Sequence, residues 1–184
     1  KDFATGTISY DPEVYSNVIS SYNMSFAGTS QTLRLDEIKL TRESGITNKT
    51  IDNFENRGND TTITVPGFST GGGTTSFTLD TLSYEGKYAG KIVFDSSFAS
   101  WAEISRNNVN INVSKVMPRF RMYSKASSAG FDILVKFRTD QNETFQKLFW
   151  KNSTDYAVIE CPLSDFVKVG EPSVYYDPSV NSTV

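Results

Sequence analysis

The 184-residue sequence contains no histidine and one cysteine, Cys161. Without histidine, the Ser-His-Asp and Cys-His catalytic arrangements and the usual zinc sites are excluded. One cysteine cannot form an intrachain disulfide, so the fold has to be stabilised by other means. Cys161 lies in a strand-like alternation without an electropositive neighbour, which predicts a small buried residue rather than a reactive thiol.

Clustered positive charge and long apolar runs are also missing. The net charge is −3 and no basic block is present, which argues against a nucleic-acid partner. The longest apolar runs, such as 133–135, are too short to span a bilayer, so we expect no membrane insertion, and no signal peptide is visible. The hydrophobic content of 38%, with 13 Phe and 9 Tyr, is sufficient for a folded core and excludes global disorder.

Asn-X-Ser/Thr triplets are frequent. Serine and threonine together make up 42 of the 184 residues, and at that frequency about three triplets would arise by chance among the 13 asparagines. The triplets have two interpretations. They are N-glycosylation sites, or they are incidental triplets of a Ser/Thr-rich bacterial surface protein. Both interpretations predict an extracellular or cell-surface location. The candidate glycosylation sites are Asn23, Asn48, Asn59, Asn112, Asn142, Asn152 and Asn181.

Short alternating segments separated by turn signals predict an all-β fold, an antiparallel β-sandwich with little or no helix. Only Asp11-Pro12-Glu13 has the pattern of a helix start, and Gly71-Gly72-Gly73 suggests a flexible surface loop. The expected strands cover 32–40, 91–94, 109–113, 119–123, 131–138 and 146–150.

Several segments together resemble the galactose-binding-like jelly-roll superfamily, which includes non-catalytic carbohydrate-binding modules of bacterial polysaccharidases. The similar segments are an opening strand, a glycine turn that leads into a strand, and later strands with their closing turn. They span roughly 51–166 and comprise Ile51–Glu55, Tyr84–Phe94, Gly130–Arg138, Asp155–Glu160 and Pro162–Phe166.

The order of the segments departs from that superfamily. Residues 32–40 resemble its last strand but precede the opening strand, so residues 1–45 are expected to be closing-type strands that complete a jelly roll. Their partner would be the body at 46–170 in a permuted domain, another unit of a tandem array, or a neighbouring copy. Residues 171–184 form a C-terminal extension that echoes the N-terminal segment, and an ordinary sandwich stays an alternative.

The resemblance also implies a structural calcium ion, where opening and closing strands meet. Asp36 and Glu55 occupy the corresponding positions, and Asp52 lies close by in the sequence. Calcium prefers carboxylate and carbonyl oxygens, and a bound ion would offset the missing disulfides. The alternative is that these three acids are solvated strand ends.

Aromatic side chains beside polar groups predict glycan binding, because sugar rings stack on aromatic faces. If Phe131, Ile133, Val135 and Phe137 face the core, then Asp132, Lys136 and Arg138 line the opposite face. Trp150 and Gln146 are further candidates, although both tryptophans, like most large aromatics of a sandwich, are expected to anchor a core or interface. The candidate ligand-binding residues are Tyr84, Tyr88, Trp101, Arg121, Tyr123 and Arg138.

No catalytic constellation is evident. Glu103 and Glu160 are possible paired carboxylates, but nothing in the sequence places them together, so we expect no enzyme. The sequence favours an extracellular module that binds polysaccharide or cell-surface glycan. The alternative is a structural subunit of a filament or surface assembly, in which copies polymerise head to tail by strand exchange, with calcium as a candidate requirement for assembly.

Overall fold

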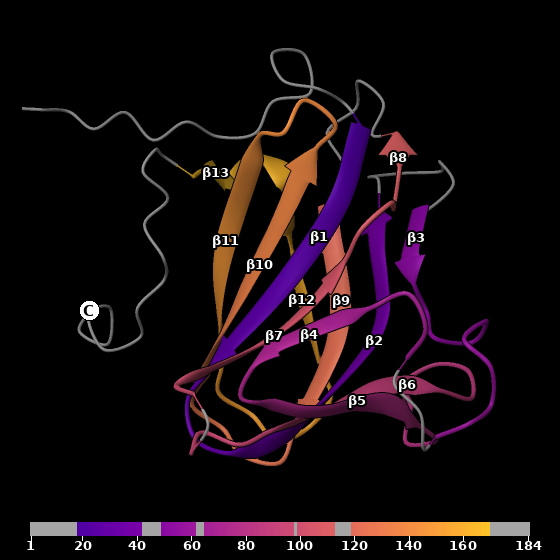
Figure 1. Cartoon of the computed structure of the whole chain (residues 1–184), viewed down its shortest axis with the longest axis vertical. Helices are drawn as coiled ribbons and strands as arrows, with labels where there is room; N and C mark the ends of the chain where they lie inside the picture. The colour runs from indigo at the N-terminus through magenta and orange to yellow at the C-terminus, as the bar shows by residue number, and fades with distance from the viewer. Residues whose placement is uncertain (1–17, 42–48, 62–64, 98, 113–118, 170–184) are drawn as a thin grey trace, which may run out of the picture.

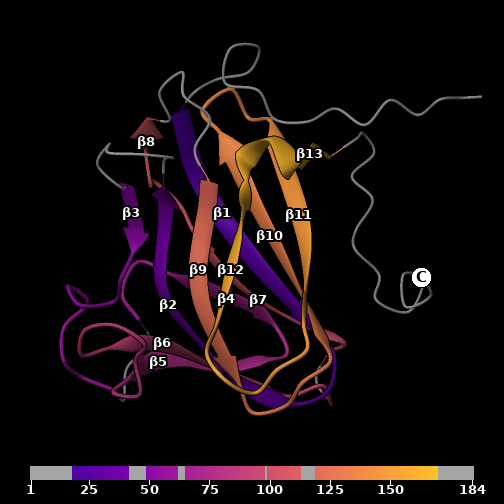
Figure 2. The same cartoon turned by 180° about the vertical axis from the view of Figure 1, so that it is seen from behind.

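The computed structural model describes residues 18–41, 49–61, 65–97, 99–112 and 119–169. These residues form two antiparallel sheets that pack face to face, so the predicted β-sandwich is confirmed (Figures 1 and 2). The only helical turn among them is a three-residue 3₁₀ turn at Leu163–Asp165, and none of them belongs to a helix that could cross a membrane. The finer jelly-roll topology stays a prediction.

Sheet A has the strand order β13-β11-β10-β1-β7-β4, and the short strand β8 pairs with the start of β1. Its strands are β1 (Val18–Ala27), β4 (Ser69–Gly72), β7 (Trp101–Arg106), β8 (Ile111–Asn112), β10 (Phe131–Thr139), β11 (Thr144–Lys151) and β13 (Val167–Lys168).

Sheet B has the strand order β12-β9-β2-β6-β5, and β3 pairs with the end of β2. Its strands are β2 (Gln31–Thr41), β3 (Lys49–Asp52), β5 (Thr74–Asp80), β6 (Ala89–Phe94), β9 (Arg119–Ala126) and β12 (Ala157–Pro162).

The core lies between the sheets and follows from the alternation of side chains along the strands. In β10, Phe131, Ile133, Val135 and Phe137 are all buried, as the sequence predicts. The buried cluster is rich in phenylalanine and continues through β1, β2, β5, β6 and β9. Cys161 is also buried there, and burial raises the pKa of its thiol to about 11, which agrees with the predicted inert residue.

The strands of residues 18–41 lie in the middle of both sheets. β1 pairs with β10 on one side and β7 on the other, and β2 pairs with β9 and β6. All of these partners belong to the same chain. Exchange of these strands between copies would therefore require two central strands to leave their sheets.

Two expectations from the sequence differ from the structure. Of the segment expected as a strand at 109–113, the described residues 109–112 contribute only the two-residue strand β8, and residue 113 lies outside the described part of the chain. Gly71-Gly72-Gly73 is not a flexible loop, because Gly71 and Gly72 end β4 and the chain crosses directly into β5 of the other sheet. Gly73 fixes this corner by donating to the carbonyl of Trp101 at 2.7 Å and accepting from Asp95 at 2.9 Å. The expected helix at 11–13 lies outside the described residues.

Candidate functional site

The outer face of sheet A carries aromatic residues at one end and polar residues at the other. Register places Trp150, Asp132, Ala27 and Trp101 in one row across β11, β10, β1 and β7. The second row, toward the polar end of the strands, contains Leu148, Leu134, Ser25 and Glu103. The third row contains Gln146, Lys136, Asn23 and Ser105. Side chains of one row lie on the same face, because register partners share it.

Both tryptophans of the first row are exposed. The exposed fraction is 38% for Trp101 and 63% for Trp150, although their size would favour burial. Their strands are three strand spacings apart, or about 14 Å between backbones. Between them in the row lie Asp132 and the small side chain of Ala27, which is buried. The tryptophans therefore do not anchor the core, and the other expectation, that they anchor an interface, stays a prediction.

Glycines provide the space in which the indole rings lie. A Cβ added to Gly72 would stand 2.8 Å from Cε3 of Trp101, and one added to Gly71 would stand 3.7 Å from its Cη2. On the other side, Gly130 lies beside Trp150, whose Cζ2 would be 3.8 Å from an added Cβ. Each ring thus rests against backbone that carries no side chain.

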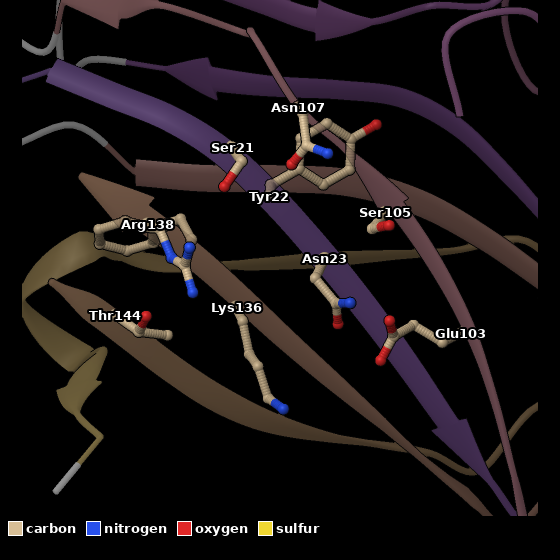
Figure 3. A pocket seen from close by; sticks show the side chains of 10 residues that line it. Ser21, Tyr22, Asn23, Glu103, Ser105, Asn107, Lys136, Arg138 and Thr144 are labelled. Atoms are coloured by element: carbon tan, nitrogen blue, oxygen red, sulfur yellow. The ribbon is translucent and has the colours of Figure 1, made fainter. Parts of the chain in front are cut away.

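The polar end of the face is hollowed into a groove of about 260 Å³ (Figure 3). In the view of Figure 3, Asn23 lies between Lys136 on one side and Glu103 on the other, as the strand order requires. The hydroxyl of Ser25 lies 3.2 Å from Oδ1 of Asn23 and 3.3 Å from Oε2 of Glu103. The groove is lined by Ser21, Tyr22, Asn23, Glu103, Ser105, Asn107, Lys136, Phe137, Arg138 and Thr144.

Lys136 and Arg138 supply positive charge to this groove. They are two positions apart on β10, so both point to the outer face. Within the described part of the chain, neither side chain forms an ion pair. The groove therefore presents two cations, one carboxylate, and the hydroxyl and amide groups that hydrogen-bond to sugars.

A second cluster lies on the outer face of sheet B and contains three of the predicted ligand residues. Tyr84 stacks on Tyr123 with ring centroids 3.7 Å apart. The guanidinium of Arg121 lies 5.2 Å from the Tyr123 ring centroid and donates a 2.5 Å hydrogen bond to its hydroxyl. Tyr156 lies beside Tyr84 at 5.7 Å. Tyr84 is 49% exposed, whereas Tyr123 is buried beneath it.

Two carboxylates hold the 81–88 loop, which carries Tyr84, against sheet B. Asp36 accepts hydrogen bonds from the backbone N–H groups of Tyr84 at 2.7 Å and Glu85 at 2.9 Å. Glu55 accepts two more, both at 2.8 Å, from the N–H groups of Lys87 and Tyr88. These carboxylates therefore accept the hydrogen bonds that the N–H groups of the loop would otherwise donate to water.

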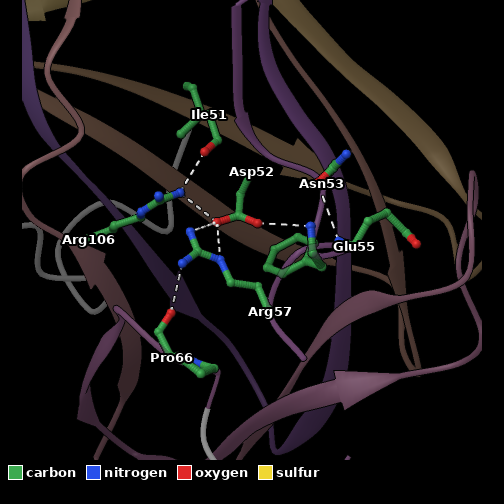
Figure 4. Close-up of polar contacts among 8 residues, drawn as sticks. Ile51, Asp52, Asn53, Glu55, Arg57, Pro66 and Arg106 are labelled. Atoms are coloured by element: carbon green, nitrogen blue, oxygen red, sulfur yellow. Dashed lines mark hydrogen bonds and ion pairs between the residues drawn. The ribbon is translucent and has the colours of Figure 1, made fainter. Parts of the chain in front are cut away.

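Asp52 is part of a separate buried cluster (Figure 4). Its carboxylate contacts Nη2 of Arg57 at 2.5 Å and Nη1 of Arg106 at 2.6 Å, and it accepts from the N–H of Phe54 at 2.8 Å. Both guanidinium groups also lie within 6 Å of the Phe68 ring, at 5.6 and 5.7 Å. One buried carboxylate is thus shared by two arginines.

The three predicted calcium ligands are engaged by other groups of the protein in this structure. Both oxygens of Asp36 accept backbone N–H groups, since Oδ1 also accepts from Glu37 at 2.8 Å. The carboxylate of Asp52 is occupied by cations, and one oxygen of Glu55 is used by the 81–88 loop. Among the described residues, no three acidic or cysteine side chains are grouped as metal ligands. Calcium binding by these residues stays a prediction of the sequence.

The remaining candidate ligand residues are divided between the two faces. Arg138 and Trp101 belong to the outer face of sheet A, and Tyr84, Arg121 and Tyr123 belong to that of sheet B. Tyr88 is only 7% exposed and packs into the core, with the ammonium of Lys87 5.0 Å from its ring centroid. The candidates thus form no single site.

Sequence reasoning did not assign a ligand role to Asn23, Ser105 and Asn107, which line the groove. For Asn23, the alternation of side chains along β1 was the available signal. Its neighbours Tyr22 and Met24 are buried, so the alternation turns Asn23 to the opposite face. Asn107 follows the end of β7, and no local pattern indicated that it would join the groove.

Glu103 and Glu160 lie on different sheets, and both are on outer faces. The sandwich core separates them, so they cannot act as a catalytic pair on one substrate.

The candidate glycosylation sites differ in exposure. Asn59, Asn142 and Asn152 lie exposed in connections between strands, whereas Asn23 is partly buried within β1. Asn112 is in β8, and Asn48 and Asn181 lie outside the described residues.

Comparison with protein-family models, curated proteins and solved structures gave no match. The resemblance to the galactose-binding-like superfamily therefore stays a prediction, and the function has to be argued from the site itself.

Proposed function

We propose that this protein is a non-catalytic glycan-binding module that acts outside the cell or at the cell surface, and that the outer face of sheet A is its binding face. The observation that carries the proposal is the row in which Trp150 and Trp101 flank Asp132 and Ala27. Aromatic rings exposed on a rigid sheet provide stacking surfaces for the apolar faces of sugar rings.

The groove beside this row supports the same function. Apart from Asn107, which follows the end of β7, its hydroxyl, amide and charged groups come from four adjacent strands, β7, β1, β10 and β11, so most of them are held by the sheet rather than by loops. Sugars present many hydroxyl groups, and a set of fixed donors and acceptors gives the hydrogen bonds that orient them. An extended glycan would lie with apolar faces on the tryptophans and hydroxyl groups in the groove. The abundance of Asn-X-Ser/Thr triplets supports an extracellular location.

Depletion from solution by a panel of neutral and acidic insoluble polysaccharides tests the proposal. Trp101→Ala and Trp150→Ala should each weaken binding about tenfold or more, since a lost stacking contact of about 1.5 kcal/mol corresponds to that factor. Val158→Ala is a matched control, because Val158 is 49% exposed but belongs to β12 of sheet B. Thermal unfolding verifies that each variant is folded.

Tyr84→Ala distinguishes the two faces. Under the proposal it leaves glycan binding unchanged, because Tyr84 lies on sheet B with Tyr123. Binding that is lost in Tyr84→Ala but retained in both tryptophan variants would contradict the proposal and assign the site to the opposite face.

A further inference from the structure

The positive charge of the groove is concentrated at one end of the binding face. Lys136 and Arg138 lie on β10, beside the hydroxyl groups of Ser21 and Thr144, which are the register partners of Arg138 on the neighbouring strands. The tryptophans lie at the opposite end of the same strands. The face therefore changes from apolar to cationic along the strand direction.

The acidic side chains nearby do not neutralise these cations. Within the described residues, neither Lys136 nor Arg138 has a carboxylate within ion-pair distance. Glu103 is on β7, with β1 between it and β10, and its carboxylate lies within hydrogen-bond distance of Ser25. Asp132 is in the tryptophan row, three residue rows away from Arg138. Two neighbouring cations without a partner carboxylate are a suitable recognition site for an anion.

We infer that the glycan bound on this face is acidic, and that Lys136 and Arg138 contact its carboxylate or sulfate groups while the tryptophans stack on its rings. The inference rests on the proposed function and adds the class of saccharide. A guanidinium binds a carboxylate or a sulfate through two parallel hydrogen bonds, and an ammonium adds a point charge beside it.

A matched pair of polymers tests the inference. Polygalacturonate carries a carboxylate on each sugar, and its methyl ester has the same backbone without the charge. The wild-type protein should bind the acid form about tenfold or more tightly, because a hydrogen bond between charged groups contributes that much. Dextran and dextran sulfate form a second pair, which determines whether the protein also recognises sulfate groups in place of carboxylates. Binding to the acidic polymers should weaken as salt is added.

Variants separate this inference from the proposed function. Lys136→Gln with Arg138→Gln should abolish the preference for the acidic form, measured as the ratio of acid to ester binding by the same variant, whereas Lys125→Gln, on sheet B, should retain that ratio. Equal binding of acid and ester by the wild type, or an acid preference that survives in the double variant, overturns the inference alone. Binding that does not depend on Trp101 and Trp150 overturns the proposed function.

Discussion

The carboxylate of Asp36 accepts a 2.7 Å hydrogen bond from the backbone N–H of Tyr84, which lies 48 positions later in the sequence. Asp36 is fully buried and lies at an irregularity of β2, where the next residue, Glu37, has a positive φ of 48°. This contact connects the central strand of sheet B with the loop that carries the exposed tyrosine. It also makes the loop sensitive to the protonation of one side chain.

The stability of the protein should depend on pH through Asp36. Burial raises the pKa of this carboxyl from 3.8 to about 6, although the N–H groups of Glu85, Tyr84 and Glu37 favour the charged form. A raised pKa means that the folded protein holds this proton more tightly than the unfolded chain. The stabilisation that this tighter proton binding adds to the free energy of unfolding is therefore fully present below about pH 4 and is lost as the pH rises through 6.

Urea unfolding of the wild type and Asp36→Asn between pH 4 and 7 measures this contribution. The free energy of unfolding of the wild type, relative to the variant, should fall across this range, because only the wild type carries the titrating group. Asp155→Asn, at an exposed position, serves as the control. Parallel pH profiles for wild type and Asp36→Asn would contradict the assignment.

The shared carboxylate of Asp52 should be among the most sensitive polar positions. Asp52→Asn keeps the shape but leaves Arg57 and Arg106 without their counterion, and we expect a loss of about 3 kcal/mol in the free energy of unfolding. Glu160→Gln provides the comparison, because its pair with Arg119 is about 30% exposed on both sides and should contribute less than about 1 kcal/mol. Equal effects in urea unfolding would show that burial does not set the strength of the Asp52 cluster.

Gly72 should tolerate no side chain. Its φ is +59°, and an added Cβ would stand 2.3 Å from the carbonyl oxygen of Trp101. Gly72→Ala combines backbone strain with a clash against backbone, so a loss of at least about 3 kcal/mol is expected. At Gly58 the φ is +93° but no atom lies within 4 Å of an added Cβ, so Gly58→Ala should lose only about 1–2 kcal/mol. Thermal or urea unfolding gives both values, and a similar loss at the two positions would contradict the steric argument.

A chelator tests the calcium site that the sequence suggested. Because Asp36, Asp52 and Glu55 hold backbone N–H groups and arginines, we expect the melting temperature to be the same in calcium and in EDTA. An increase of several degrees with calcium, lost in Glu55→Gln, would restore the predicted site.

The fold class could be predicted from the sequence because strand alternation is local. The alternation along 131–138 correctly assigned the buried Phe131, Ile133, Val135 and Phe137 and the outer face of Asp132, Lys136 and Arg138, although Leu134 on the outer face is also buried. The exposure of Trp101 and Trp150 could not be predicted in this way, because it depends on which strands become neighbours and on their register. A large aromatic residue with no structural context is most often buried, and that general preference favoured the core position, which the structure does not show.

The glycine run and the acidic residues show a second limit. The sequence 71–73 has the composition of a loop, yet its backbone forms the end of β4 and a corner between the sheets. Asp36 and Glu55 have the chemistry of calcium ligands, but carboxylates also accept backbone N–H groups, as these two do. Composition cannot distinguish these uses, because the donor groups come from residues far away in the chain.

The central positions of β1 and β2 affect how the molecule can be made. During synthesis from the N-terminus, β1 emerges before both of its neighbours, and its second neighbour, β10, ends only at Thr139. Neither sheet can be completed until most of the described chain has been released, so β1 lacks its neighbour on one side and β2 lacks β9 during that interval. Slow folding and a need for protection from aggregation during translation follow from this topology.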